Sequence, residues 1–337
     1  MEGEILNYVK AWLQVIPSLS YCFLIAKLLP PSSSSLRLFL LLPVVCFFLY
    51  LPLNVHSLHL GGTFAFFIAW LANFKLFLLA FNKGPLSHPS LSLPRFILLA
   101  SLPIKFHDNQ NQKGQKSPIN YAIKALILAA IVRSYEYKEH FHPKLLLTLY
   151  SFHIYLTLEI ILAVFATMSR TLVGIELEPQ FNEPYLSSSL QDFWGRRWNL
   201  MATGILRPTV YRPTYSVFVL LMGRKWASLP AVFATFFVSG LVHELMFYYL
   251  GRARPTWEIT WFFVLHGLCL VVEIGLKKQL SGTVWLPRMV SGPFTVGFVL
   301  ITAFWLFFPQ LLRCNADQRV LQEYAAVIAC LENVTVS

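Results

Sequence analysis

Long apolar stretches recur along this chain, and they constrain its fold more than any other feature. A helix needs about 20 predominantly apolar residues to cross a bilayer, and eight segments approach or exceed that length. Of all residues, 56% are hydrophobic and 13% charged, with a mean hydropathy of +0.58. The chain is therefore predicted to be an all-α, polytopic membrane protein. The predicted spans are residues 8–29, 36–54, 58–82, 119–134, 144–168, 228–250, 257–276 and 288–309.

Three apolar pieces differ from a regular membrane span. The fourth span is short, so a tilted or partly re-entrant helix is an alternative there. The apolar pieces at 94–104 and 201–222 are predicted to be interfacial or re-entrant. No polar stretch is long enough to bury a core of its own, so residues 1–337 are expected to form one membrane-embedded domain. We find no internal repeat, which weakens a transporter interpretation based on inverted halves.

Basic residues are concentrated in the loops after the third, fifth and seventh predicted spans. The positive-inside rule therefore places the 169–227 loop in the cytosol and both termini in the lumen. The sequon Asn333-Val334-Thr335 agrees with that orientation. The basic residues of the three loops are Lys83, Arg95, Lys105, Lys113 and Lys116; Arg170, Arg196, Arg197, Arg207, Arg212, Arg224 and Lys225; and Lys277, Lys278 and Arg288.

Two ionisable residues, His243 and Glu244, interrupt the otherwise apolar segment 231–250. A charge near the membrane centre costs a few kcal/mol, so such residues indicate function by default. An imidazole titrates near neutral pH and can take a proton from a hydroxyl. The alternative is a polar pair that only holds helices together. Glu244 points about 100° away from His243 on a helix, so we expect it to pair elsewhere.

The 169–227 loop contains a second informative segment around residues 188–201. Ser188 or Ser189 can cap a helix there, and Asp192 and Arg196 have the spacing of an ion pair. An apolar face follows the same helix at Leu190, Phe193, Trp194, Trp198 and Met201. An interfacial helix among lipid headgroups explains this pattern equally well. Likewise, the net charge of +11 and the Arg207-Pro208 and Arg212-Pro213 turns suit either phosphates or anionic lipid.

Several motifs together resemble the plant wax synthase family, the long-chain-alcohol O-acyltransferases of the membrane-bound O-acyltransferase superfamily. The resemblance extends over nearly the full length. Its motifs are Gln191-Asp192-Phe193-Trp194-Gly195-Arg196-Arg197-Trp198-Asn199, Ser239-Gly240-Leu241-Val242-His243-Glu244, Trp70-Leu71-Ala72-Asn73-Phe74-Lys75, Gly84-Pro85-Leu86-Ser87, Glu178-Pro179-Gln180-Phe181-Asn182-Glu183-Pro184-Tyr185 and Thr260-Trp261-Phe262-Phe263-Val264-Leu265-His266-Gly267.

This resemblance implies an endoplasmic-reticulum enzyme that moves an acyl group from acyl-CoA to an alcohol. The family's catalytic histidine falls on His243 and its motif asparagine on Asn199. His243 lies about 15 residues into its predicted span, roughly 22 Å deep, so a buried reaction tunnel is required. His243 would be the general base and Asn199 an oxyanion donor. The expected substrate-binding residues are Asp192, Trp194, Arg196, Arg197, Trp198, Arg207, Arg212 and Glu244.

Further expectations concern partners and the remaining polar residues. Acyl-CoA is a co-substrate, and no metal, other cofactor or nucleic acid is expected, since the cysteines are scattered and form no ligand pair. Lys75 and Glu159 could pair within the membrane, and His266 is expected to be a hydrogen bonder between helices. A di-iron desaturase would need more histidine boxes than the pair His56 and His59.

The acceptor alcohol is the least constrained part of this interpretation. Large aromatic residues in 228–250 and 257–276 would narrow a path to His243, which favours a thin, long-chain fatty alcohol and a wax ester product. A sterol or diacylglycerol is the alternative acceptor, and a lipid or solute transporter is the non-enzyme alternative. The aromatic residues are Phe233, Phe236, Phe237, Phe247, Tyr248, Tyr249, Trp261, Phe262 and Phe263.

Overall fold

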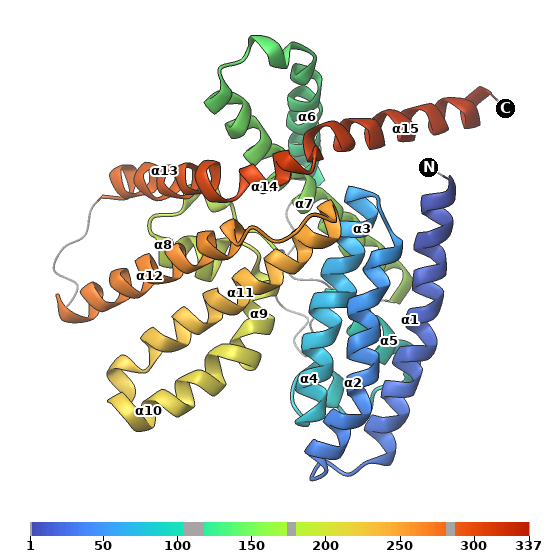
Figure 1. Ribbon diagram of the computed structural model, residues 1–337, viewed down its shortest axis with the longest axis vertical. Coiled ribbons are helices and arrows are strands. Elements are labelled where there is room, and N and C mark those ends of the chain that lie inside the picture. The colour runs from blue at the N-terminus through green and yellow to red at the C-terminus, as the bar shows by residue number, and fades with distance from the viewer. Residues whose placement is uncertain (1, 104–117, 174–179, 281–286, 337) are drawn as a thin grey trace.

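The computed structural model describes residues 2–103, 118–173, 180–280 and 287–336, and every regular element in these ranges is a helix (Figure 1). The all-α prediction is confirmed. Parts of three sequence features lie outside the described residues: the end of the 94–104 piece, the loop lysines Lys105, Lys113 and Lys116, and the motif residues Glu178 and Pro179.

The helices vary from single turns to long membrane-crossing rods. The α-helices are α1 (Glu2–Leu28), α2 (Ser34–Tyr50), α3 (Leu58–Phe64), α4 (Asn73–Ala80), α5 (Leu93–Ser101), α6 (Pro118–Ser134), α7 (Pro143–Val173), α8 (Leu190–Asp192), α9 (Leu200–Leu206), α10 (Arg212–Trp226), α11 (Ser228–Gly251), α12 (Glu258–Gln279), α13 (Arg288–Leu306), α14 (Phe308–Arg313) and α15 (Ala316–Val336). The 3₁₀ segments are η1 (Leu51–Asn54), η3 (Pro85–Ser87), η4 (Tyr135–His140) and η5 (Pro184–Leu186). The π-helical segments are η2 (Ala65–Ala72), η6 (Phe193–Arg197) and η7 (Arg207–Tyr211).

Seven helical stretches among the described residues are long and apolar enough to cross a membrane, and they coincide with seven of the eight predicted spans. The multi-pass prediction is therefore confirmed. The eighth, 119–134, is the 17-residue helix α6. At 1.5 Å per residue it spans about 25 Å, less than the roughly 30 Å hydrocarbon core. The seven are Gly3–Leu28, Ser34–Asn54, Leu58–Ala80, Pro143–Thr167, Ser228–Gly251, Glu258–Gln279 and Arg288–Arg313.

The continuous helix formed by α3, η2 and α4 lies at the centre of the largest core. Of its most apolar stretch, 78% is buried, against 22–44% for the other candidate spans. Apolar residues occur all round this helix, as expected for a helix enclosed by others. It packs among α1, α2 and α5, which stand together in Figure 1, while α10, α11 and α12 extend to the opposite side. Short α9 contributes Met201 and Ile205 to the same core.

Two glycines let α11 and α12 pack closely against each other. A Cβ on Gly267 would lie 2.8 Å from Cβ of Phe236, and a Cβ on Gly240 would lie 3.1 Å from Cα of Thr260. Small residues at such crossings allow helix backbones to approach each other within membranes. Gly240 lies one turn before His243 and Glu244, so this contact also positions the segment that carries them.

The predicted ion pair between Lys75 and Glu159 is wrong, because each has a partner elsewhere. Lys75 is 2% exposed and donates to the carbonyl oxygens of Leu99 and Leu102, both at 2.6 Å. These carbonyls belong to the C-terminal end of α5, where a cation is favoured by the helix dipole. Glu159 of α7 pairs with Lys124 of α6 at 2.7 Å. Lys124 lies in the first half of α6, within the shortest of the eight predicted spans.

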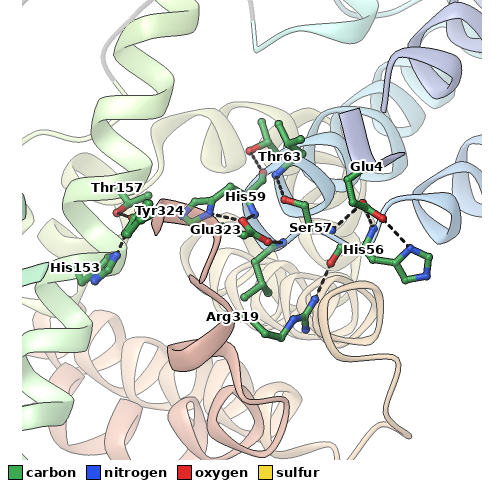
Figure 2. A network of polar contacts seen from close by, with 12 residues as sticks. Glu4, His56, Ser57, His59, Thr63, His153, Thr157, Arg319, Glu323 and Tyr324 are labelled. Atoms are coloured by element: carbon green, nitrogen blue, oxygen red, sulfur yellow. Dashed lines mark hydrogen bonds and ion pairs between the residues drawn. The ribbon is translucent and has the colours of Figure 1, made fainter. Parts of the chain in front are cut away.

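A polar network joins the C-terminal helix α15 to the start of α3 (Figure 2). The Glu323 carboxylate accepts hydrogen bonds from the backbone N–H of Leu58 at 2.5 Å and of His59 at 3.1 Å, and contacts Nδ1 of His59 at 2.6 Å. Arg319 donates to the carbonyl oxygen of His56 at 2.6 Å. The backbone N–H groups of Leu58 and His59 lie in the first turn of α3, where no acceptor is available within the helix. They are thus satisfied by a side chain more than 260 positions away in the sequence.

Glu323 should make the docking of α15 sensitive to acid. Burial alone would raise the pKa of its carboxyl, but the hydrogen bonds from His59 and the two backbone N–H groups outweigh it and hold the pKa below its ordinary value. A carboxyl group whose pKa is lower in the folded protein than in the unfolded chain stabilises the fold above about pH 4.5. This stabilisation is lost as the pH falls through the pKa of the folded state. Glu323→Gln should lower the free energy of unfolding by about 1–3 kcal/mol at pH 7. Acidification should then lower the stability of this variant less than that of the wild type. Thermal unfolding of the purified protein between pH 4 and pH 7 checks this.

The matched control is Glu139→Gln, which neutralises an exposed glutamate outside the network. It should unfold like the wild type at each pH. Equal stability of the two variants would contradict the docking role of Glu323.

Candidate active site

His243 lies on α11 between two aromatic rings from different helices. Its ring centroid is 4.2 Å from that of Phe263 on α12 and 5.3 Å from that of Trp70 in η2. Nδ1 lies 2.7 Å from the carbonyl oxygen of Ser239. A carbonyl can only accept, so Nδ1 carries the hydrogen and neutral His243 keeps the lone pair on Nε2. Nε2 has no hydrogen-bond partner within the described part of the chain.

Glu244 points away from His243 and caps the next helix. This agrees with the expectation that it pairs with a group other than His243. Its carboxylate accepts hydrogen bonds from the backbone N–H of Trp257 at 3.1 Å, and from the N–H and Oγ1 of Thr260 at 3.2 and 3.1 Å. These groups lie at the N-terminus of α12, where a negative charge is favoured. The side chain is 3% exposed. A role for Glu244 in substrate binding stays a prediction.

His266 provides a useful contrast to His243, because both of its ring nitrogens have partners. The indole Nε1–H of Trp194 donates to Nδ1 at 3.0 Å, so Nε2 carries the hydrogen in the neutral ring and donates to Oγ1 of Thr302 at 2.8 Å. His266 is fully buried. These contacts give it the helix-packing role that the sequence predicted, and they leave no ring nitrogen for a substrate.

The predicted pair between Asp192 and Arg196 is wrong, because the backbone there is π-helical. The Trp198 N–H donates to the carbonyl of Phe193, five residues earlier. A π-helical turn therefore holds about one residue more than an α-helical turn. As a result, Asp192 pairs with Arg197, whose Nε lies 2.7 Å from Oδ2 of Asp192. Burial would raise the pKa of the Asp192 carboxyl, but hydrogen bonds from Arg197 and the Ser188 N–H hold it below its ordinary value. The expected helix cap is also present, as Ser189 accepts from the Asp192 N–H.

The two tryptophans of this segment fix it against the rest of the fold. Trp198 stacks on Phe193 with ring planes 13° apart and meets Phe181 edge-on. Trp194 contacts Phe263, the ring that also faces His243, at a centroid distance of 5.8 Å. Both tryptophans therefore have structural partners, and their predicted contact with substrate stays a prediction.

Asn199 ends the π-helical segment and begins α9. Its backbone is left-handed, with φ of 42°, a conformation that asparagine tolerates better than most residues. Its Oδ1 accepts from the Ala202 N–H at 3.1 Å, which leaves the two N–H groups of its amide without a partner among the described residues. No hydrogen bond joins Asn199 to His243 in that part of the chain. The amide is thus able to donate to a ligand, and its oxyanion role stays a prediction.

The four arginines expected to bind substrate have different environments. Arg197 is held inside the fold by Asp192 and by the carbonyl oxygen of Asn182 at 3.1 Å. Arg196, Arg207 and Arg212 are exposed, and their guanidinium groups make no hydrogen bond or ion pair with the described residues. Of the four, these three present free guanidinium groups to a negatively charged ligand.

Sequence reasoning missed Trp70 as a residue of this site, although it lies in a motif that carried the family resemblance. Trp70 is 2% exposed, and its Nε1–H is buried without a hydrogen-bond partner among the described residues. A buried donor without a partner costs about 1–3 kcal/mol, so its position against His243 calls for an explanation. No pattern of spacing singles out one indole among nine tryptophans.

The site as a whole offers a neutral imidazole with one accepting nitrogen and, beside it, the indole N–H of Trp70, which lacks a partner among the described residues. Such a set can remove a proton from a hydroxyl and stabilise a developing negative charge. Among the described residues, no group of three or more His, Cys, Asp or Glu side chains could hold a metal ion.

Comparison with known proteins identifies relatives over nearly the whole chain. Residues 177–265 match the membrane-bound O-acyl transferase family. The chain is 49% identical over 330 residues to acyl-CoA–sterol O-acyltransferase 1 of Arabidopsis thaliana, covering 95% of each protein. It is 46% identical over 334 residues to the long-chain-alcohol O-fatty-acyltransferase of Simmondsia chinensis, covering 96% of this chain and 95% of the relative. It is 44% identical over 337 residues to probable long-chain-alcohol O-fatty-acyltransferase 3 of Arabidopsis thaliana, covering 99% and 97%.

Proposed function

This chain belongs to the membrane-bound O-acyltransferase family, as an enzyme of the wax synthase type, and on that premise we propose that it joins a fatty acyl group from acyl-CoA to a long-chain fatty alcohol with His243 as the base. The observation that carries the proposal is the free Nε2 of His243. The relatives are named as acyltransferases, which favours this function over the desaturase and transporter alternatives.

The hydrogen bond from Nδ1 to the carbonyl oxygen of Ser239 leaves Nε2 of His243 as the nitrogen that can accept a proton. With the hydrogen on Nδ1, Nε2 accepts the proton of the alcohol while the alcohol oxygen attacks the thioester carbonyl carbon. The resulting tetrahedral intermediate carries a negative oxygen. When it collapses, the carbon–sulfur bond breaks and the CoA thiolate takes the proton back from Nε2. The ester and free CoA leave, and His243 returns to its starting state.

The negative oxygen of the intermediate needs hydrogen-bond donors, and two unpartnered donors belong to this site. Asn199 keeps its amide N–H groups free, because its oxygen caps α9. Trp70 keeps its indole N–H free and buried beside the His243 ring. Donors that already stand without partners need no reorganisation during the reaction, which is the basis of oxyanion stabilisation. We therefore assign both groups to the oxyanion of the intermediate.

The exposed arginines suit the phosphates of CoA. Arg196, Arg207 and Arg212 lie in the loop that the positive-inside rule places in the cytosol, where CoA is found. Their guanidinium groups can bind phosphate oxygens in pairs. We extend the proposal to the endoplasmic-reticulum membrane as location, with the 169–227 loop cytosolic, and to a single domain over residues 1–337. Contacts between distant parts of the sequence, such as that of Leu58 with Glu323, support the last point.

The acceptor is proposed to be a long-chain fatty alcohol, with a sterol or diacylglycerol as the alternative. The relatives include both a sterol and a long-chain-alcohol acyltransferase at similar identity, so their names do not decide between the two. The packing around His243 supports the thinner acceptor, because Phe263 is only 4% exposed and its ring lies against the imidazole. Phe237, Tyr248 and Trp261 do not contribute to a narrow path, since they are exposed on the outside of the protein.

Replacing His243 tests the base. We expect His243→Gln to lower ester formation by about 10²–10⁴-fold with little change in melting temperature. His266→Gln should instead lower the melting temperature, since it removes a histidine with two internal hydrogen bonds. Product formation from labelled acyl-CoA and thermal unfolding measure the two effects. Near-normal turnover by His243→Gln would exclude it as the base.

Two conservative replacements test the oxyanion donors. Trp70→Phe removes an unpartnered N–H, so it should lower kcat by about 10²-fold while the melting temperature stays the same or rises. Asn199→Asp keeps the oxygen that caps α9 but loses the amide donors, and should also lower kcat more than it raises KM. The control is Trp194→Phe, which breaks the bond to His266 and should lower stability. If Trp70→Phe melts early and turns over normally, Trp70 only packs.

Arginine neutralisation separates ligand binding from folding. Arg196→Gln, Arg207→Gln and Arg212→Gln should raise KM for acyl-CoA and weaken its dependence on salt, because exposed charges are screened by ions. Arg197→Gln should leave Asp192 without its ion-pair partner and cost about 1–3 kcal/mol of stability. Steady-state kinetics at two salt concentrations, with melting curves, distinguish the groups. An unchanged KM for acyl-CoA in the variant that combines all three replacements would instead indicate that these arginines contact lipid headgroups.

A competition assay tests the acceptor. With equal amounts of a long-chain alcohol and a plant sterol and one acyl-CoA, the wild type should form mainly wax ester. Phe263→Leu should raise the share of sterol ester several-fold by widening the space beside His243. Trp261→Leu, at an exposed position on the same helix, should leave the ratio unchanged. Sterol ester as the main wild-type product would show that the aromatic residues form a sterol pocket.

A further inference from the structure

A small cavity lies where three candidate membrane spans end, well separated in the sequence from His243. Its volume is about 50 Å³, and its walls come from the last turns of α1 and α4, the first turn of α2, and the segment from η3 to α5. The ends of membrane-crossing helices lie at the depth of lipid headgroups. The polar residues at the cavity are Lys27, Arg37, Asn82, Ser87 and His88.

Arg37 is the unusual residue of this cavity, because its guanidinium is buried without a negative partner. It is 3% exposed. It donates to the carbonyl oxygens of Leu29 and Ala26 and to Oδ1 of Asn82, all of which are neutral. Its Nε–H is buried and has no hydrogen-bond partner among the described residues. The carbonyls belong to the C-terminal end of α1 and satisfy part of the guanidinium, but they do not neutralise its charge.

The surrounding sequence offers almost nothing that could balance this charge. Between Glu4 and Glu136 the chain has a single acidic residue, Asp108, against eleven lysines and arginines. None of the residues that line the cavity is acidic. Burying an ionised group without a counter-charge costs several kcal/mol. The charge balance therefore calls for a negative group from outside the chain.

Two further cationic or donor groups stand at the same cavity. Lys27 uses one hydrogen of its ammonium group for the carbonyl oxygen of Pro89, at 2.6 Å. His88 contacts Oγ of Ser90 through Nδ1, so its Nε2 has no partner among the described residues. Arg37, Lys27 and His88 thus offer a charged guanidinium, a charged ammonium and an imidazole to one small space.

We propose that this cavity binds a phosphate group, that of a phospholipid whose acyl chains lie along the outer surface of α1 and α2. A cavity needs about 10–15 Å³ for each water, so 50 Å³ admits a group of a few heavy atoms and excludes a whole lipid or nucleotide. Phosphate oxygens can accept from several donors at once, and basic pockets between membrane helices suit lipid phosphates. The bound lipid would hold α1, α2 and α4 together. The inference does not depend on His243 or on the acceptor.

The test is the thermal stability of the purified full-length protein in a maltoside detergent after removal of lipid. Phosphatidylglycerol should raise the melting temperature by several degrees at saturation, because a ligand bound only by the folded state stabilises it. A galactolipid with the same acyl chains but no phosphate should have little effect. Lys27→Ala and His88→Ala should each raise the phosphatidylglycerol concentration for half the effect, by about tenfold for Lys27→Ala. Arg37→Gln should abolish the response.

The matched control is Lys83→Ala, which removes an exposed lysine near the same end of α4 that does not line the cavity. It should respond like the wild type. Because Arg37 also bonds to α1, Lys27→Ala and His88→Ala carry the test if Arg37→Gln does not fold. Free CoA is tested as a second ligand in the same assay. If CoA raises the melting temperature and the rise depends on Lys27, CoA would be identified as the source of the phosphate. Equal responses of Lys27→Ala and Lys83→Ala, or of the two lipids, would overturn the proposal.

Discussion

The hydrogen bonds of the Glu244 carboxylate hold together the part of the fold on which the proposed reaction depends. One carboxylate caps α12 through Trp257 and Thr260, and Thr260 begins the helical turn that carries Phe263. Phe263 in turn lies against His243, one residue before Glu244 in the sequence. Thr260 is 8% exposed, so its N–H and hydroxyl groups rely on this carboxylate rather than on water. The acidic residue beside the proposed base therefore acts through the backbone of the neighbouring helix.

Much of this arrangement could be predicted from local sequence patterns. Length and hydropathy predicted eight spans, and seven of them coincide with long apolar helices among the described residues, because a bilayer tolerates few polar residues in a crossing helix. The same rule singled out His243, and the geometry of a helix predicted that Glu244 would pair elsewhere. Ser189 was one of two expected helix caps and occupies that position. These successes concern interactions within one element or between an element and lipid.

The errors concern contacts between elements and departures from α-helical geometry. Asp192 pairs with Arg197 because a π-helical turn adds a residue, which a pattern of i and i+4 spacing does not reveal. Lys75 and Glu159 each found a partner on a different helix, and spacing along the chain carries no information about helix neighbours. The role proposed for Trp70 depends on the absence of a partner for one buried atom among the described residues, which only the packed structure shows.

The three π-helical segments change which side chains share a face of their helices. Each of them, η2, η6 and η7, contains or adjoins residues of the candidate site. A π-helical turn closes its hydrogen bond from residue i to residue i+5, so it takes up one residue more than an α-helical turn. Side chains in such a turn therefore meet different neighbours from those that α-helical spacing predicts. Asp192 and Arg197, five residues apart, form an ion pair in this way. A search for site motifs that assumes i and i+4 spacing would miss this pair.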